Sequence, residues 1–356
     1  MVAYSDVLAS NALIPKTIAP DLVAVFVGAT SGIGEYTLRA LAKYAVRPRI
    51  YFVGRSQEAA TRIVAACREV NPEAELLFLK SDVSLIRNVD EVCREIAGKE
   101  KTINLISLSQ GVMYNTIGKG SHHCSWSQTD DDQVTDEGLR APIALVHYSR
   151  LRFLVNLLPL VERAQGLQRV LSIFAGGKEG PINLSDLRVD HGINPMALRG
   201  HLAAMQTFAL ETLATRYPSV SFVHDYPGPV RSQIARDKNM LNFVLRSVFA
   251  VVGPFIYIPN EESGERHVFI ATSARYPAAS TNDEAGVELA DGVVISKGAD
   301  GKLGSGNYTT DAQCEASNAS VDAVLEKMRK DGVPQKVWEH TEAEFVRMVG
   351  SAAITQ

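Results

Sequence analysis

Short runs of apolar, often β-branched residues alternate along the first two thirds of the chain with longer stretches whose apolar residues recur at helical spacing. The short runs predict buried strands, which we place at residues 22–28, 49–53, 76–80, 103–108, 169–174 and 219–224. The longer stretches predict helices, which we place at residues 33–45, 57–70, 86–97, 141–164 and 198–216. This alternation predicts a parallel sheet covered on both faces, so we expect a doubly wound, Rossmann-like α/β fold.

The alternation is lost in the last third of the chain. We therefore assign residues 1–235 to the Rossmann-like domain, and residues 236–356 to a C-terminal extension that packs on the same domain as a substrate lid. The extension begins with an apolar run at 241–258, which Arg246 and a Gly-Pro pair interrupt. This run is too short and too interrupted to cross a membrane as one helix. We therefore expect a lid helix, with contact to a membrane surface as the alternative. Apolar residues at helical spacing predict two further helices, at residues 321–330 and 336–349.

Composition and charge narrow the class of protein. The chain has 356 residues, is 46% hydrophobic and carries a formal net charge of -4, so we expect a globular protein that does not bind nucleic acid. The four cysteines form no Cys-x-x-Cys pair, and the adjacent His122, His123 and Cys124 lack a fourth ligand at metal-binding spacing. We therefore expect no metal site. Without a recognisable signal peptide, we expect reduced thiols and a cytoplasmic protein.

A glycine-rich segment follows the first predicted strand and opens the first predicted helix. Gly28 permits a tight turn, Gly32 lets the backbone approach a diphosphate, and Gly34 allows the helix to pack closely. The N–H groups at the start of the helix then point toward phosphate oxygens. This pattern, between a strand and a helix, predicts a dinucleotide site that comprises Gly28, Thr30, Ser31, Gly32, Ile33 and Gly34.

The end of the second predicted strand indicates which dinucleotide binds. An NAD site places a carboxylate there for the ribose 2′-hydroxyl, whereas this chain has Arg55 between Gly54 and Ser56. A guanidinium offers paired N–H donors and a fixed charge to a 2′-phosphate. We therefore expect NADP(H) as the cofactor, with a solvated arginine that has no ligand as the alternative.

These motifs resemble those of the short-chain dehydrogenase/reductase family. Asp82-Val83 matches the family's acid after the third strand, which faces the adenine, and Gln110-Gly111 falls on its Asn-Asn-Ala-Gly position. The segment Pro227-Gly228-Pro229-Val230-Arg231-Ser232 matches its Pro-Gly-x-Val-x-Thr segment near the nicotinamide amide. The resemblance covers residues 20–235 and implies that Asp82, Val83, Gln110, Gly111, Pro227, Val230 and Ser232 contact the cofactor. The loop G-A-T-S-G-I-G-E looks most like fungal members from secondary-metabolite pathways.

The family's acid–base residues are absent from the matching positions. The resemblance implies a Ser after the fifth strand and a Tyr-x-x-x-Lys pair at the start of the next helix. This chain has Ala175, Ala197 and His201 there, and no tyrosine lies between Tyr148 and Tyr217. The position of the family's Asn, near 146–148, holds no Asn either. The carbonyl chemistry of the family would thus need other proton donors here.

His201, Tyr148 and His147 are the candidate catalytic residues. His201 stands at the lysine position, and a histidine donates a proton near neutral pH. Tyr148 would hold the substrate oxygen from the facing helix, with His147 beside it. The alternative is structural: His201 bonds a backbone carbonyl, and the other two side chains lie in the core.

Three functions remain open at this point. The first is an NADP(H)-dependent oxidoreductase that acts on a carbonyl or hydroxyl of an apolar small molecule such as a secondary metabolite, with proximity supplying much of the rate. The second is an isomerase, dehydratase or cyclase on the same scaffold, because the redox reaction loses its usual acid catalyst. The third is a silent NADP(H)-binding module. Resemblance also implies a homo-oligomer that pairs through the helices at 141–164 and 198–216.

Overall fold

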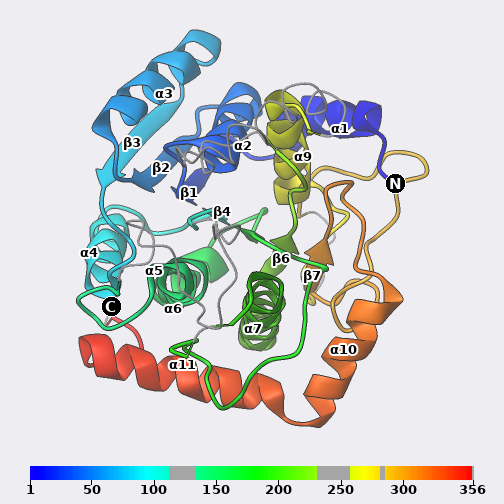
Figure 1. Ribbon diagram of the computed structural model, residues 1–356. Helices are drawn as coiled ribbons and strands as arrows, with labels where there is room; N and C mark the ends of the chain where they lie inside the picture. The colour runs from blue at the N-terminus through cyan, green and yellow to red at the C-terminus, as the bar shows by residue number, and fades with distance from the viewer. Residues whose placement is uncertain (112–133, 192, 231–256, 281–284, 355–356) are drawn as a thin grey trace, which may run out of the picture.

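A parallel sheet of seven strands forms the centre of the computed structural model, which describes residues 1–111, 134–191, 193–230, 257–280 and 285–354 (Figure 1). The strands are β1 (Val23–Val27), β2 (Arg49–Gly54), β3 (Glu75–Lys80), β4 (Leu105–Leu108), β5 (Arg169–Ile173), β6 (Ser221–Asp225) and β7 (Asn307–Thr310). Their order is β3-β2-β1-β4-β5-β6-β7, and every neighbouring pair is parallel. The order reverses between β1 and β4, so the predicted doubly wound α/β fold is confirmed.

Helices cover both faces of this sheet. One face carries α1 (Tyr4–Thr17), α2 (Gly32–Tyr44), α3 (Gln57–Val70) and α9 (Asn260–Thr272). The other carries α4 (Ile86–Ala97), the short α5 (Ala141–Ile143), a π-helical turn η2 (Ala144–Tyr148), α6 (Ser149–Glu162) and α7 (Pro195–Arg216). The predicted single helix at 141–164 is thus three consecutive elements, and the π turn rotates the side chains within it relative to α6.

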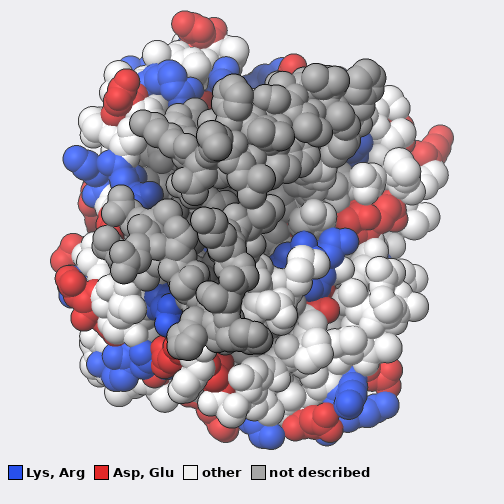
Figure 2. Space-filling model, in the orientation of Figure 1, with Lys and Arg blue, Asp and Glu red and all other residues white. Residues whose placement is uncertain are grey.

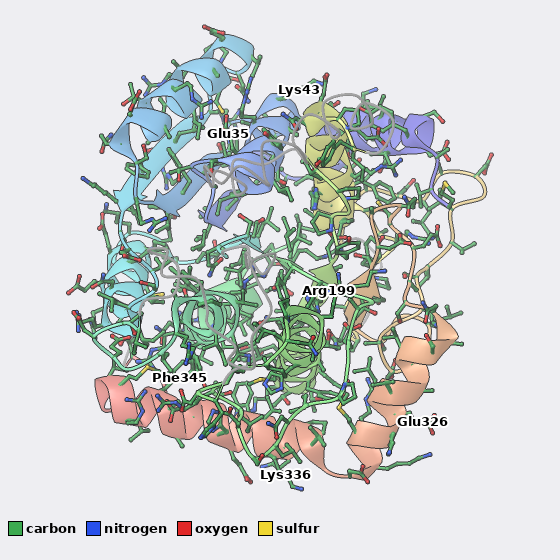
Figure 3. The ribbon with its side chains drawn as sticks, in the orientation of Figure 1. Glu35, Lys43, Arg199, Glu326, Lys336 and Phe345 are labelled. Atoms are coloured by element: carbon green, nitrogen blue, oxygen red, sulfur yellow. The ribbon has the colours of Figure 1, made fainter. Side chains whose placement is uncertain are left out.

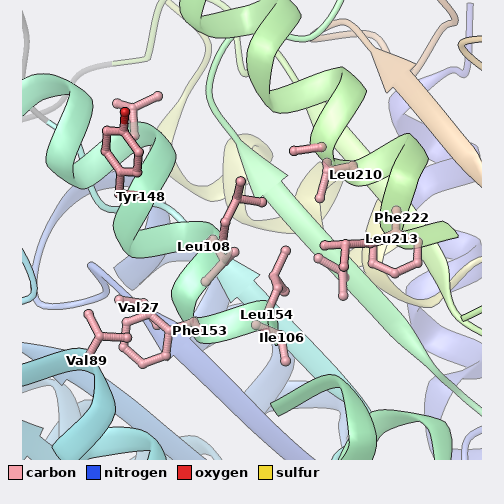
Figure 4. Close-up of a cluster of buried hydrophobic side chains, with 14 of the residues drawn as sticks. Val27, Val89, Ile106, Leu108, Tyr148, Phe153, Leu154, Leu210, Leu213 and Phe222 are labelled. Atoms are coloured by element: carbon pink, nitrogen blue, oxygen red, sulfur yellow. The ribbon is translucent and has the colours of Figure 1, made fainter. Parts of the chain in front are cut away.

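The two cores follow from the alternation of side chains along each strand. In β1, Val23, Val25 and Val27 face the layer of α4, α6 and α7, whereas Ala24 and Phe26 face the layer of α2 and α9. All five residues of β1 are buried, as a strand covered on both faces requires. Figure 4 shows the first core, where Phe153 and Leu154 of α6 lie against the strands.

The described part of the C-terminal extension is built into the fold and does not form a separate lid. α9 covers the sheet beside α2, and β7 pairs with β6 as the edge strand. Two further helices, α10 (Ala319–Lys330) and α11 (Val333–Val349), form an outer layer along α7 and α4 (Figure 1). Residue 235 itself lies outside the described residues, so the boundary at this residue stays a prediction. Most of the apolar run 241–258 lies outside the described residues, so its role as a lid helix stays a prediction.

α11 covers the helices through which we expected two copies of the chain to pair. Val337, Trp338 and Phe345 of α11 are buried in the same core as Tyr148 of η2 and Leu202 of α7. Figure 3 shows Phe345 on the side of α11 that faces α6, whereas Lys336 and Glu326 lie on the outer surface. Pairing through α6 and α7 would first require α11 to leave, and the oligomeric state itself stays a prediction.

Surface features agree with an ordinary globular chain. On the face that Figure 2 shows, acidic and basic side chains alternate around the described rim. Among the described residues, no helix has the length and apolar content that crossing a bilayer demands. The same part of the chain contains no group of three His, Cys, Asp or Glu side chains arranged to hold a metal ion, while His122, His123 and Cys124 lie outside it.

Candidate functional site

The glycine loop joins the carboxyl end of β1 to the start of α2, as predicted. Gly28 has φ +80° and Gly32 has φ +60°, a left-handed backbone that favours glycine. A Cβ on Gly28 would lie 2.5 Å from the backbone nitrogen of Gln110, so the loop passes directly over the end of β4. A Cβ on Gly34 would collide with Ser109 Oγ and lie 2.9 Å from the carbonyl oxygen of Gly28. These close approaches bring the first turn of α2 down onto the sheet.

The first turn of α2 presents backbone donors at the point where the strand order reverses. Ser31 occupies the N-cap position with extended backbone, but its side chain makes no capping hydrogen bond. The N–H groups at a helix start have no partner within the helix, and the helix dipole is positive there. The residues present therefore fit a diphosphate in this cradle, together with Thr30 and Ile33 of the same loop.

The end of β2 fits a 2′-phosphate. Arg55 is exposed and makes no ion pair or side-chain hydrogen bond with the residues that the structure describes. A Cβ on Gly54 would lie 2.6 Å from Thr30 Oγ1, so the end of β2 lies against the glycine loop. Arg55 is thus next to the cradle with a free guanidinium. This geometry is compatible with NADP(H).

The other predicted cofactor residues lie at the carboxyl ends of β3 and β4. Asp82 is exposed after β3, where its carboxylate accepts hydrogen bonds from the backbone N–H and the hydroxyl of Ser84, and Val83 is buried. Gln110 is buried after β4, and Gly111 follows it with partial exposure. The structure therefore brings these residues to the same edge of the sheet as the glycine loop.

The predicted nicotinamide segment follows β6 on that edge. Pro227 borders a small depression whose lining also includes Asp225 and His267. Asp225 Oδ2 lies 3.0 Å from His267 Nε2 and fixes the end of β6 to α9. Val230 pairs with Ile258 in a parallel bridge. Ser232 lies outside the described residues, so its contact with the cofactor stays a prediction.

The side chain of His201 is enclosed by the protein and does not border an open site. Its side chain is buried, Nδ1 accepts a hydrogen bond of 3.1 Å from the backbone N–H of Asn183, and Nε2 faces the Leu187 carbonyl oxygen at 3.4 Å. Burial lowers the pKa of the imidazole. His201 therefore holds the 183–187 loop against α7, and proton donation from Nε2 to a substrate would require its contact with Leu187 to break. This geometry fits the structural alternative.

His147 and Tyr148 point toward α11, away from the edge that carries the glycine loop. His147 Nε2 lies 2.9 Å from Thr341 Oγ1, and the Tyr148 hydroxyl lies 2.7 Å from His340 Nε2. Burial raises the pKa of Tyr148 well above its ordinary value. The predicted catalytic roles of these two residues therefore find no support in their positions. The π turn η2 and the covering helix α11 are the physical reasons, because both determine which way residues 147 and 148 face.

The buried His147 predicts a dependence of stability on acid. Burial lowers the pKa of its imidazole to about 3, compared with about 6.5 in an unfolded chain. Below pH 6.5 the unfolded chain binds a proton that the folded chain does not, so stability falls as the pH falls toward 3. Between pH 7 and pH 5 this single group is expected to remove about 2 kcal/mol. Urea unfolding of the wild type and of His147→Gln at the two pH values measures this difference.

His191→Gln is the matched control for this experiment, because the His191 side chain is 86% exposed. We expect His191→Gln to retain the full acid sensitivity of the wild type and His147→Gln to lose about 2 kcal/mol of it. Equal sensitivity in all three proteins would show that His147 titrates in the folded state much as it does in the unfolded chain.

A chain of buried polar groups surrounds Ala175, which the resemblance matches to the family's Ser. Ala175 follows β5, and its N–H donates to His224 Nε2 at 3.2 Å. His224 Nδ1 lies 2.8 Å from Thr207 Oγ1, and that hydroxyl donates to Glu179 Oε1 at 2.7 Å. All three side chains are buried. Since Nε2 accepts from a backbone N–H, this chain of polar groups fixes the loop after β5 and does not face a substrate.

Arg150 is a residue of this edge that sequence reasoning missed. Its buried guanidinium donates to the carbonyl oxygens of Gln110 at 2.7 Å and Ile173 at 3.0 Å, and to Ser172 Oγ at 2.8 Å. It thus joins the ends of β4 and β5 beside Gly111. The signal in the sequence was a charged residue on an otherwise apolar face of the 141–164 stretch.

The sheet order and the glycine loop together define a Rossmann-type α/β protein. Residues 22–146 match the short chain dehydrogenase family. The oxidoreductase andH of Emericella variicolor is 34% identical over 354 residues, which are 99% of this chain and 99% of its own. The oxidoreductase AN1596 of Emericella nidulans is 36% identical over 346 residues, which are 96% of this chain and 98% of its own. The chain belongs to the short-chain dehydrogenase family, and the resemblance to fungal members is confirmed.

Solved structures show the same fold. The L-sorbose reductase of Gluconobacter frateurii, whose crystal structure contains NADPH and L-sorbose, covers 79% of this chain and 99% of its own. The TM-score is 0.51 at 16% sequence identity. At this identity the likeness concerns the fold alone.

Proposed function

We propose that the protein is an NADP(H)-dependent oxidoreductase that acts on a carbonyl or hydroxyl group of a secondary metabolite. The observation that carries the proposal is the intact cradle: Gly28, Gly32 and Gly34 hold the start of α2 against the sheet, and Arg55 beside it has no side-chain partner among the described residues. A protein that no longer bound a dinucleotide would have no need of this geometry. NADPH supplies a hydride when it is bound, and the family membership supports redox chemistry.

Each described residue of the site has a defined task in this proposal. The backbone of the glycine loop binds the diphosphate through N–H donors, and Arg55 binds the 2′-phosphate. Asp82 and Val83 border the adenine, while Gly111 and Pro227 border the nicotinamide half. Ala175 and Ala197 carry no acid–base group, so binding and orientation of the substrate against the cofactor would supply most of the rate.

Arg55→Asp is the experiment that tests the cofactor assignment. Titration calorimetry of the wild type is expected to show tighter binding of NADPH than of NADH. Loss of a charge-assisted contact and the new repulsion from the phosphate are expected to weaken NADPH binding by about 10–100-fold. NADH binding is expected to change little, because the 2′-hydroxyl of NADH can donate a hydrogen bond to a carboxylate at this position.

Arg163→Asp, at an exposed arginine after α6, makes the same change of charge away from the cradle. It is expected to leave both affinities unchanged. A wild type that binds none of the nicotinamide dinucleotides would refute the proposed function. An unchanged NADPH-to-NADH ratio in Arg55→Asp would refute only the role of Arg55.

A non-redox reaction on the same scaffold is the second candidate. The observation that favours it is that alanine occupies the positions of both the family's Ser and its Tyr, at Ala175 and Ala197. Carbonyl reduction without a positioned acid loses about 10²–10⁴-fold in rate. Turnover of a substrate with no change in NADPH absorbance would select this candidate.

A further inference from the structure

Two cationic residues follow, within three residues in the sequence, the positions that the resemblance matches to the family's Ser and Tyr. Lys178 follows Ala175 by three residues, and Arg199 follows Ala197 by two in the first turns of α7. The two segments are in contact, because the backbone N–H of Gly180 donates to the carbonyl oxygen of Gly200 at 2.9 Å. Helices of a parallel α/β sheet begin at the carboxyl edge of the strands, so this pair lies on the ligand-binding edge. Figure 3 shows Arg199 on the side of α7 toward β6 and β7.

Neither cation has an acidic partner in the described residues. Arg199 is half-buried, its Nε is shielded from solvent, and it makes no hydrogen bond or ion pair there. Lys178 is also half-buried, and its side-chain Nζ lies 4.9 Å from the centroid of the Tyr226 ring. Arg329, which is also partly buried, has the carboxylate of Glu211 at 2.7 Å. Two half-buried cations without a counter-ion on a ligand-binding edge are unusual, because removing charge from water is costly unless it is paired.

We propose that Lys178 and Arg199 form a subsite for a carboxylate group of the substrate. The planar guanidinium matches the two oxygens of a carboxylate, and the ammonium adds a second charge. The cofactor's own phosphates do not need this pair, since they are assigned to the glycine loop and Arg55 on the opposite side of the strand-order reversal. The inference rests on the proposed function for the place of the substrate beside the nicotinamide half.

Neighbouring apolar residues indicate the rest of the substrate. Met196, in the first turn of α7, is 66% exposed, and Leu184, in the loop before it, is 40% exposed. Together with the cations they favour an amphipathic molecule, apolar along its length and acidic at one point. The sequence analysis predicts an apolar substrate, and the subsite adds that this substrate carries a negative charge.

A pair of matched probes tests the subsite without knowledge of the natural substrate. Octanoate and octanamide have the same chain and nearly the same shape, and they differ in charge. Ligand-observed NMR titration is carried out with the full-length protein, once alone and once with saturating NADP⁺. We expect the wild type to bind octanoate about tenfold more tightly than octanamide, as a charge-assisted contact provides.

Three variants assign the preference to residues. Arg199→Gln and Lys178→Gln are each expected to reduce the tenfold preference severalfold, with octanamide binding unchanged, and Arg199→Lys is expected to keep part of it. Arg163→Gln removes the same charge from an exposed position and is expected to keep all of it.

The outcomes separate this inference from the proposed function. Equal binding of the two probes by the wild type, or a preference that survives in both glutamine variants, overturns the subsite. A preference lost equally in Arg163→Gln also overturns it, since only net charge would then matter. Because the titration without cofactor does not depend on NADP⁺, a protein that binds octanoate selectively but no dinucleotide would refute the proposed function and leave the subsite standing.

Discussion

Replacement of Gly34 by valine is expected to abolish NADPH binding. A Cβ at this position collides with Ser109 Oγ and lies 2.9 Å from the Gly28 carbonyl oxygen and 3.0 Å from Ala29 Cα. Two of these three neighbours belong to the backbone of the loop itself, which cannot move aside as a flexible side chain would. The first turn of α2 must then lift from β1 and carry its N–H donors away from the diphosphate. Titration calorimetry with NADPH measures the loss, and circular dichroism checks the fold.

Two further variants show whether the effect is local. Gly166→Ala is the control, since a Cβ there meets nothing within 4 Å and the residue follows α6 at the opposite edge of the sheet. Its φ of +69° makes alanine strained, so some loss of stability with full NADPH affinity is expected. Gly34→Ala combined with Ser109→Gly removes the closest collision and is expected to recover part of the affinity. Undiminished NADPH binding by Gly34→Val would refute the assignment of the cradle.

The sequence predicted the cradle because its chemistry is local. Gly28, Gly32 and Gly34 lie within one turn between a strand and a helix, and the strand and helix each have a clear period. The same holds for Asp82 and Gln110, which end strands whose position the apolar runs had fixed. Parallel strands present their carboxyl ends at one edge, so residues far apart in sequence could be placed together without knowledge of any contact.

The candidate catalytic residues could not be placed in this way. Which way Tyr148 and His147 face depends on a single π turn, and a rotation by part of a turn moves a side chain from one layer to another. The role of His201 depends on the loop at 183–187, which has no periodic pattern. Arg199 has no acidic partner among the described residues, and only three-dimensional contacts reveal this.

The elements that the sequence analysis missed differ in kind. α1 had a readable signal, since Val7, Asn11 and Ile14 are buried at helical spacing. β7 had little, because its sequence Asn-Tyr-Thr-Thr holds one large apolar residue, and it becomes a strand by pairing with β6. α11 was predicted as a helix but not as the cover of α6 and α7. Tertiary contacts determine that residues 307–310 form a strand and where α11 lies, and the local sequence pattern determines neither.

One buried ion pair lies beneath the end of α11 and adds to the core contacts that hold this helix. Arg152 of α6 binds Asp90 of α4 through two contacts, Nε to Oδ1 at 2.6 Å and Nη2 to Oδ2 at 2.8 Å. Both side chains are almost fully buried. Arg152 also donates to the carbonyl oxygen of Ser351, just after α11, at 2.8 Å, and Asn156 donates to Asp90 at 2.9 Å. The pair thus joins two helices of one layer to the end of the covering helix.

Asp90→Asn is expected to lower the free energy of unfolding by about 3–5 kcal/mol, because it leaves the Arg152 charge buried without a counter-ion. Asp21→Asn is the matched control: Asp21 also binds an arginine, Arg47, through two contacts of 2.9 Å, but both side chains are largely exposed. Asparagine also tolerates the positive φ of Asp21, so little change is expected there. Urea unfolding of the three proteins at pH 7 gives the comparison, with limited proteolysis to detect release of α11. Equal, small losses in both variants would mean that solvent reaches Arg152 in the folded protein. A large loss confined to Asp90→Asn would show that the buried pair, unlike the exposed one, contributes substantially to the stability of the fold.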